Sequence, residues 1–276
     1  MNLLNDYRKF EKLVNKYDGS GILNISTTYF LAPTTLIPLL CFINGNEINK
    51  IITNPCTNDY VYRILNGMKI CATIPYTILP TSEKTRQNDD IASKMALNFG
   101  HEEYTGSQTI FHVYNELINN VYNHTPFEEG YANHGYIYAQ KYPSKRKLDV
   151  CVMDDGLSIP GKFEMYGFEF EDDCDAIFQA INQTSTAKED VDSPKYKRGS
   201  GLYTTLRLVI EGNGGSALIV SRNGCLYIKS KDNFKYYSLD NNNIFKGTLV
   251  SLRFNKNPVQ NYYSFIEIDD GIQYRY

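Results

Sequence analysis

The stretch VMDDGLSIP, Val152 to Pro160, decides the fold that we expect for this chain of 276 residues. It begins within the apolar run LDVCVM, which is typical of a buried β-strand. Two acidic residues and Gly156 follow, so the chain is predicted to leave the sheet in a tight turn with Asp154 at the sheet edge. Taken alone, the pattern is just as typical of a plain turn at the end of a strand.

Upstream, the segment ELINNVYNH, starting at Glu116, predicts part of a helix with two different faces. Glu116 and Asn120 form a polar file along one side. A carboxylate there can order or deprotonate a water molecule, and an amide oxygen is a hard ligand suited to Mg²⁺. A solvated helix face explains the same pattern, so this helix alone leaves both interpretations open. The predicted core face is formed by Ile110, Val113, Leu117 and Val121.

Downstream, the segment KRGSGLYTTLRLVIEGNGG, 197–215, predicts a glycine-rich turn that opens a helix. Glycines at a helix N-terminus let backbone N–H groups approach phosphate oxygens. The dinucleotide-binding plan is not followed, because no GxGxxG lies between a first strand and its helix. The residues expected to face inward are Leu202, Leu206, Val209 and Ile210.

Taken in chain order, the three segments resemble the Bergerat-fold (GHKL) ATP-binding module shared by histidine kinases, type II topoisomerases, MutL-type repair proteins and anti-sigma-factor kinases. ELINNVYNH resembles its N box, VMDDGLSIP its first glycine box, and RGSGLYTTLRLVIEGNGG its second glycine box with the following helix. The segments ALIVSRNGCLYI and KGTLVSLRF resemble its closing strands, including Gly247 and Thr248. The resemblance covers residues 95–256 and implies an α+β fold in which a mixed sheet carries helices on one face.

The resemblance also implies roles for individual residues. Asn120 would coordinate Mg²⁺, Glu116 would polarise a water or hydroxyl nucleophile, and Asp154 would accept a hydrogen bond from the adenine amino group. Ser158 departs from the family pattern, since a second glycine is usual there. The lid over the nucleotide would span about 161–198, where Lys195, Lys197 and Arg198 are solvated or neutralise phosphate. The full set of expected ATP-binding residues is Asn120, Asp154, Gly156, Ser158, Gly199, Ser200, Gly201, Leu202 and Thr248.

Two domains are expected, 1–85 and 86–276, because the polar segment LPTSEKTRQNDD separates two patterned regions. In the first, strands alternate with helices, which predicts a small parallel α/β layer. Its pattern resembles a STAS-type domain, the fold of anti-sigma-factor antagonists. The phosphorylatable serine of that family is not clearly present, and Thr34 and Thr35 lie where it would be sought.

These features predict an Mg²⁺-dependent ATP-binding protein that hydrolyses ATP or phosphorylates Ser or Thr of a regulatory protein partner. The alternative is a non-catalytic, ATP-gated interaction module. A histidine kinase is disfavoured, because His101 lies only 15 residues before Glu116 and leaves no room for a helical hairpin. His112 and His134 are expected to be structural or surface residues.

The composition bears on the partners and the location that we expect for the protein. A formal net charge of -3 gives no electrostatic reason to expect a nucleic-acid or membrane partner. The six cysteines form no CxxC pair, which favours reduced thiols, and the N-terminus lacks the pattern of a secretory signal. We therefore expect a cytoplasmic protein, with homodimerisation left open.

Overall fold

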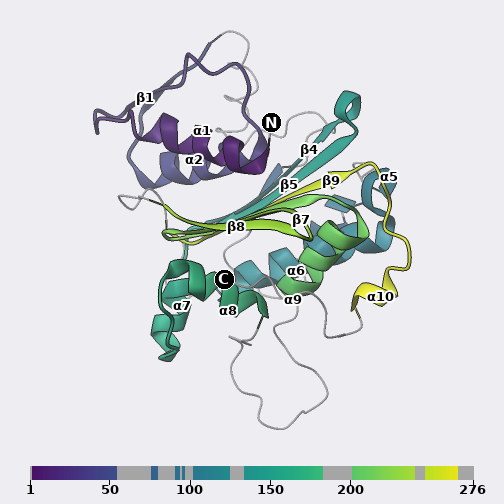
Figure 1. Ribbon diagram of the computed structural model, residues 1–276. Helices are drawn as coiled ribbons and strands as arrows, with labels where there is room; N and C mark the ends of the chain where they lie inside the picture. Colours follow the sequence, from purple (N-terminus) through teal and green to yellow (C-terminus); the bar gives the residue numbers. More distant parts are fainter. Residues whose placement is uncertain are drawn as a thin grey trace.

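The computed structural model describes residues 2–54, 76–79, 91–93, 95–96, 102–124, 134–182, 201–239 and 246–266. At its centre lies a seven-stranded sheet with strand order β3-β4-β5-β9-β6-β7-β8, in which every neighbouring pair is antiparallel (Figure 1). The strands are β3 (Tyr76–Leu79), β4 (Gly135–Tyr142), β5 (Lys147–Asp154), β6 (Ser216–Ser221), β7 (Gly224–Ser230), β8 (Asn233–Ser238) and β9 (Thr248–Asn255).

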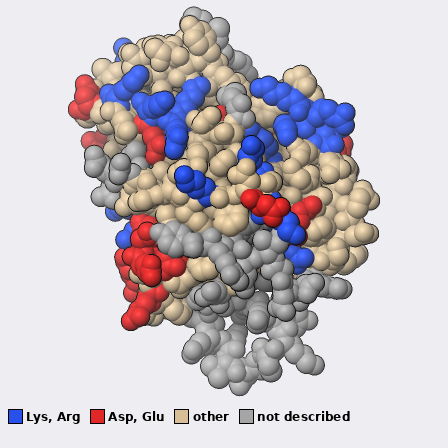
Figure 2. Space-filling view, viewed as in Figure 1, with Lys and Arg blue, Asp and Glu red and all other residues tan. Residues whose placement is uncertain are grey.

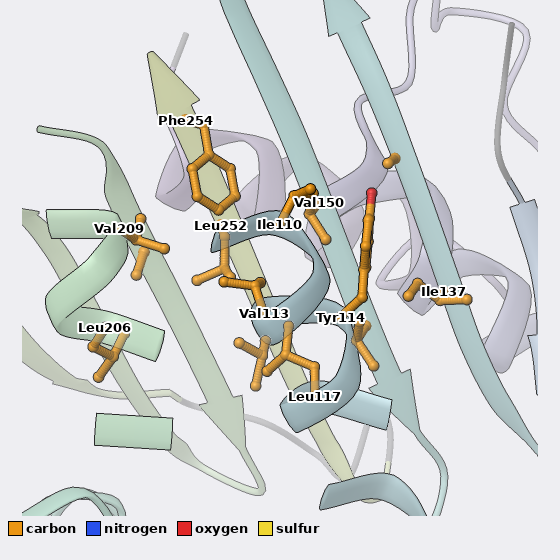
Figure 3. Packing of buried hydrophobic residues seen from close by; sticks show 14 of the residues in the cluster. Ile110, Val113, Tyr114, Leu117, Ile137, Val150, Leu206, Val209, Leu252 and Phe254 are labelled. Carbon is orange, nitrogen blue, oxygen red and sulfur yellow. The ribbon is translucent and has the colours of Figure 1, made fainter. Parts of the chain in front are cut away.

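One face of the sheet is covered by helices that include those expected from ELINNVYNH and from KRGSGLYTTLRLVIEGNGG (Figure 1). Figure 3 shows the core side of α6, where Val113 and Leu117 point toward Leu252 of β9, as the periodicity predicted. The helical elements on this side are α5 (Glu102–Thr105), α6 (Ser107–His124), α7 (Ser158–Tyr166), α8 (Asp173–Asn182), α9 (Gly201–Arg207) and the π-helix η3 (Leu208–Gly212). The short α10 (Tyr263–Ile266) follows β9 and lies near α9.

Helices α1 (Leu3–Val14) and α2 (Pro33–Gly45) cover the opposite face (Figure 1). Their apolar side chains share a second hydrophobic cluster with Tyr136, Tyr138 and Met153 of the sheet. Next to them, β1 (Ile22–Asn24) and β2 (Lys50–Ile52) form a two-stranded parallel sheet. This strand, helix, strand order was predicted for the N-terminal region, and Pro33 opens α2 as expected.

The α+β class is confirmed, and the described helices within 95–256 lie on one face of the sheet as expected. The expectation of a mixed sheet is wrong, and α1 and α2 of the N-terminal region cover the other face. The sheet is antiparallel and is covered on both faces, because β4 and β5 present apolar side chains in both directions. In β4, Tyr136 and Tyr138 face α2, whereas Ile137 and Ala139 belong to the cluster around α6. A strand that is buried on both faces needs a layer of helices on each side.

The N-terminal helices are also joined to the sheet by charge. Arg253 of β9 donates from Nε and Nη2 to the two carboxylate oxygens of Asp149, both at 2.6 Å, and from Nη2 to Asp6 of α1 at 3.2 Å. Asp149 is fully buried and Asp6 is almost so. The polar segment predicted to divide the domains lies mainly outside the described residues, so that boundary stays a prediction.

Thr34 and Thr35 are fully buried within this layer. The hydroxyl of Thr34 lies 2.6 Å from that of Ser251, and the hydroxyl of Thr35 donates to the carbonyl oxygen of Asp6 at 2.7 Å. Both hydroxyls are therefore structural, and neither is open to a kinase in this conformation. The described part of this region gives no support to the phosphoacceptor that the STAS resemblance led us to look for.

Half of the expected lid is packed structure. Residues 161–182 form most of α7 and all of α8, and Ile177 and Ile181 of α8 belong to the core beside α6. A flap over a ligand would need to swing freely, which a helix in the core does not do. The lid prediction is thus narrowed to 183–198, which lies outside the described residues. No described helix is long and apolar enough to cross a membrane.

Candidate functional site

Glu116 and Asn120 lie one turn apart on α6, and both are half-buried. The helix starts after Gly106, whose φ of +83° requires the left-handed conformation that glycine adopts without strain. Burial raises the pKa of the Glu116 carboxyl above its usual range. A carboxylate with a raised pKa binds a proton more readily at neutral pH, which suits a group that must accept one.

Gly201 places the start of α9 directly against that carboxylate. A Cβ atom added to Gly201 would lie 1.9 Å from Oε2 of Glu116, so only a glycine allows this approach. Leu202 and Leu206 then anchor α9, since Leu206 is fully buried and Leu202 packs against the same core. The structure therefore brings Glu116 and Gly201 together, two residues that lie in separate sequence segments. Gly199 and Ser200 lie outside the described residues.

Asp154 ends β5, with its carboxylate in a buried turn. The backbone N–H of Gly156 donates to Oδ1 of Asp154 at 2.9 Å, and Asp154 is only 6% exposed. Gly247, which precedes β9, lies against this turn with φ +92°, and an added Cβ would stand 2.0 Å from the carbonyl oxygen of Asp154. Gly247 and the turn after β5, residues 154–156, therefore form one compact unit.

The side chain of Asp154 points toward the α6 side of the sheet. Along β5, Val150 and Val152 belong to the core around α6, whereas Cys151 and Met153 face the N-terminal helices. Because successive side chains along a strand point to opposite faces, the side chain of Asp154 lies on the same face as those of Val150 and Val152. The carboxylate is thus on the same side of the sheet as Glu116.

Ser221 links Thr248 to α7. The sheet register pairs Ser221 of β6 with Thr248 of β9, and their hydroxyl oxygens are 3.0 Å apart. The Ser221 hydroxyl oxygen also accepts a hydrogen bond from the backbone N–H of Ile159 at 2.8 Å. This fully buried serine was not predicted, since only the register of β6 on β9 distinguishes it from any polar residue at a strand end.

Ser158 has a backbone conformation that is unusual for a residue other than glycine. Its φ is +72°, in the left-handed region that favours glycine. The hydroxyl oxygen of Ser158 accepts a hydrogen bond from the backbone N–H of Gly161 at 3.1 Å, inside the first turn of α7. The backbone therefore keeps the conformation expected of a glycine, while the side chain adds a local hydrogen bond.

Lys162 connects this turn to α6. Its buried ammonium donates to the carbonyl oxygen of Asn123 at 3.4 Å, near the C-terminal end of α6. One side of α6 carries Glu116, Asn120 and Asn123 at helical spacing, over about 10 Å along the helix axis. The contact of Lys162 therefore joins α7, which follows the turn at Asp154, to α6 about two turns after Glu116.

Two histidines lie near these groups. His134 donates its backbone N–H to Oδ1 of Asp155 at 2.8 Å, and its ring Nδ1 lies 3.1 Å from Oδ2. His112, one turn before Glu116, has its Nδ1 3.1 Å from the hydroxyl of Tyr262, and burial lowers the pKa of its ring. The partnership of His134 with Asp155 could not be seen in the sequence, because 21 positions separate the two residues.

Comparison of the chain with protein-family models, with curated proteins and with solved structures found no match. The assignment of a function therefore depends on the residues and their geometry.

Proposed function

We propose that the chain binds ATP together with Mg²⁺ along the polar side of α6, and that it uses Glu116 to activate a nucleophile toward the γ-phosphate. The observation that carries this proposal is that two carboxylates on the α6 side of the sheet each lie beside a glycine, Glu116 beside Gly201 and Asp154 beside Gly247. An extended nucleotide has its base at one end and its phosphates at the other, which matches two separate polar groups.

The Asp154 end suits the base. An ionised carboxylate accepts hydrogen bonds only, so it pairs with the exocyclic amino group of adenine and repels the carbonyl oxygen that guanine carries at that position. The carboxylate is buried and held by Gly156, so it is oriented before a ligand arrives. Thr248 and Ser221 add hydroxyl groups on the same side of the sheet.

The Glu116 end suits the phosphates. Asn120 offers an amide oxygen one turn from a carboxylate, and both are oxygen ligands of the kind that Mg²⁺ prefers. When bound, the ion would neutralise charge that develops on the phosphate oxygens. Among the described residues no cluster of His, Cys, Asp or Glu could hold a metal ion by itself, so the phosphates would have to supply part of the coordination.

Glu116 would accept the proton of the attacking water or hydroxyl as a new P–O bond forms at the γ-phosphorus and the bond to ADP breaks. Its raised pKa fits this role. If the nucleophile is water the protein is an ATPase, and if it is a Ser or Thr hydroxyl of a regulatory partner the protein is a kinase. Without turnover, the same site would serve as an ATP-gated interaction module.

The test uses the pure full-length chain with Mg²⁺ and γ-labelled ATP. Calorimetry first measures ATP and GTP binding, and we expect ATP to bind and GTP to bind more weakly. Released phosphate then indicates an ATPase, and acid-stable label on an added protein indicates a kinase. Binding without turnover indicates the interaction module. Absence of ATP binding would overturn the proposal.

A further inference from the structure

The end of α7 exposes a compact apolar surface formed by Met165, Tyr166 and Phe168, here called the α7 patch. Their exposed fractions are 47%, 40% and 39%. Only seven large hydrophobic side chains are exposed among the described residues, and three of them fall within these four positions. Scattered exposed apolar residues are ordinary, whereas a concentration of them marks an interaction site.

The α7 patch is preorganised by the chain beneath it. The buried ring of Phe163 lies 5.4 Å from that of Phe168, measured between ring centroids. Gly167 ends α7 with φ +72°, and the backbone N–H of Phe168 returns to the carbonyl oxygen of Phe163 at 3.0 Å. The ammonium of Lys162 lies 5.2 Å from the centre of the Tyr166 ring. A surface held in this way loses little conformational entropy when it binds a partner.

Strong negative charge surrounds the α7 patch. Residues 164–175 contain six Asp or Glu and no Lys or Arg. Figure 2 shows acidic side chains gathered on the side of the molecule where α7 and α8 lie. Arg222 pairs with Glu164 at 2.8 Å and approaches Asp173 at 3.6 Å, and Asp172 caps α8. The exposed side chains of Glu169 and Glu171 have no ion pair among the described residues.

This combination restricts what can dock. Nucleic acid and anionic lipid are repelled by an acidic surface. A second copy of the chain could offer the basic residues of α1, such as Arg8 and Lys12, but the apolar face of that helix is buried against the sheet. A fitting partner has to present apolar side chains and positive charge together.

We propose that the α7 patch docks a protein segment in which exposed apolar side chains are flanked by Lys or Arg. Apolar contact with Met165, Tyr166 and Phe168 supplies the affinity, while Glu169 and Glu171 select for positive charge and speed association. Since α7 starts directly after the turn that holds Asp154, a bound partner would contact the element next to the candidate site. The docking proposal does not depend on ATP binding.

The test measures binding of fluorescein-labelled model peptides to the full chain by fluorescence anisotropy, without nucleotide. One peptide is an amphipathic helix with Leu on one face and Lys on the other. Its two counterparts replace every Lys by Glu, or every Leu by Ser. We expect the Leu/Lys peptide to bind best, with an affinity that falls as salt is raised.

Two variants of the patch test the location of binding. Met165→Ser with Phe168→Ser, and separately Glu169→Lys with Glu171→Lys, should each weaken the Leu/Lys peptide by about tenfold or more. The matched control, Tyr29→Ser with Glu102→Lys, changes exposed residues elsewhere and should bind as the unaltered chain does. Circular dichroism checks that all variants are folded.

Equal binding of the three peptides, or undiminished binding by both patch variants, would overturn the proposal. Analytical sedimentation measures whether the chain is a monomer or a dimer, which tests the location of the patch in another way. If the unaltered chain is a dimer and Met165→Ser with Phe168→Ser makes it a monomer, the α7 patch is a contact between copies of the chain, and the docking proposal is wrong.

Discussion

The carboxylate of Glu116 and the Cα atom of Gly201 lie in direct contact, so close that an added Cβ would stand 1.9 Å from Oε2. The contact joins α6, which carries the polar file, to the first residue of α9. A Cβ added to Gly201 would displace the carboxylate at the far end of the flexible Glu116 side chain. A Cβ added to Gly247 would instead meet backbone atoms of Asp154. Position 201 is therefore where the geometry of Glu116 can be altered with little damage to the fold.

Gly201→Ala should leave the free energy of unfolding within about 1 kcal/mol of that of the unaltered chain, since Glu116 can rotate away. Turnover of ATP, if the proposed function holds, should fall by roughly 10² because the base is misplaced. Urea unfolding and phosphate release measure the two effects. Gly45→Ala is the control, because its added Cβ would meet nothing within 4 Å. A large loss of stability in Gly201→Ala would show that Glu116 cannot move.

Glu116→Gln should leave ATP binding nearly intact and slow turnover by roughly 10² to 10⁴. In the unaltered chain, the rate should rise with pH through the pKa of this carboxyl, which burial places above its usual range. The rate measured against pH for both chains checks this dependence. If Glu116→Gln showed the same rise of rate with pH, the rise would belong to the titration of another group.

The same shift affects stability. A raised pKa in the folded state means that folding favours the protonated carboxyl. The contribution of Glu116 is therefore most favourable below the unfolded pKa, and it declines as pH rises through the window up to the folded pKa. The free energy of unfolding of Glu116→Gln should not show this decline with pH. If the free energies of unfolding of the two chains changed in parallel across that pH window, the prediction would be wrong.

Asp154→Asn should weaken ATP binding by about 1.5 to 3 kcal/mol, the scale of a hydrogen bond to a charged group. The asparagine keeps an oxygen that can accept from the N–H of Gly156, so the turn should survive. Calorimetry with ATP measures the loss. Asp155→Asn is the matched control, since that side chain pairs with His134, and its effect on ATP affinity should be small. Unchanged affinity in Asp154→Asn would remove Asp154 from the proposed site.

Local patterns predicted much of this structure. The spacing of Val113 and Leu117 predicted α6 and its core face, and the apolar run before Asp154 predicted β5. Helix periodicity and strand alternation are properties of short stretches of sequence, which is why they can be found without a structure. The sequence also contains a sign that both faces of the sheet are covered. Tyr136 and Ile137 are adjacent apolar residues of one strand, so their side chains face opposite ways and both faces need cover.

The remaining features depend on contacts between distant parts of the chain. The pairing of Ser221 with Thr248 follows from the register of two strands, and the addition of β3 to the edge of the sheet follows from its pairing with β4. Neither leaves a local pattern. The lid was predicted too long because its bounds came from the family resemblance, and the burial of Ile177 becomes apparent only when α8 packs on the sheet.

Ser158 allows a test of backbone conformation at the start of α7. Ser158→Gly and Ser158→Ala both remove the hydroxyl that accepts from Gly161, so comparing them isolates the backbone. Since φ is +72°, the glycine variant should be more stable than the alanine variant by about 1 kcal/mol. Urea unfolding of the two variants measures this difference. Equal stability would mean that position 158 does not hold the left-handed conformation in solution.

Arg253 lies between the carboxylates of Asp149 and Asp6. Arg253→Met removes the partner of a fully buried carboxylate, and such a loss costs about 3 to 5 kcal/mol. The free energy of unfolding, measured in urea, should fall by that amount, and α1 should become more accessible to proteases because Asp6 also loses its ion pair. Adding Asp149→Leu to Arg253→Met should recover part of the stability, since the unpaired charge is then gone.

The matched control for Arg253 is Arg222→Met. Arg222 pairs with Glu164 at 2.8 Å, but both side chains are considerably exposed, at 36% and 55%. Water and salt screen such a pair, so its removal should cost no more than about 1 kcal/mol. If the two methionine variants lost the same stability, burial of the Asp149 carboxylate would not explain the effect. The charge cluster would then not be what holds α1 on the sheet.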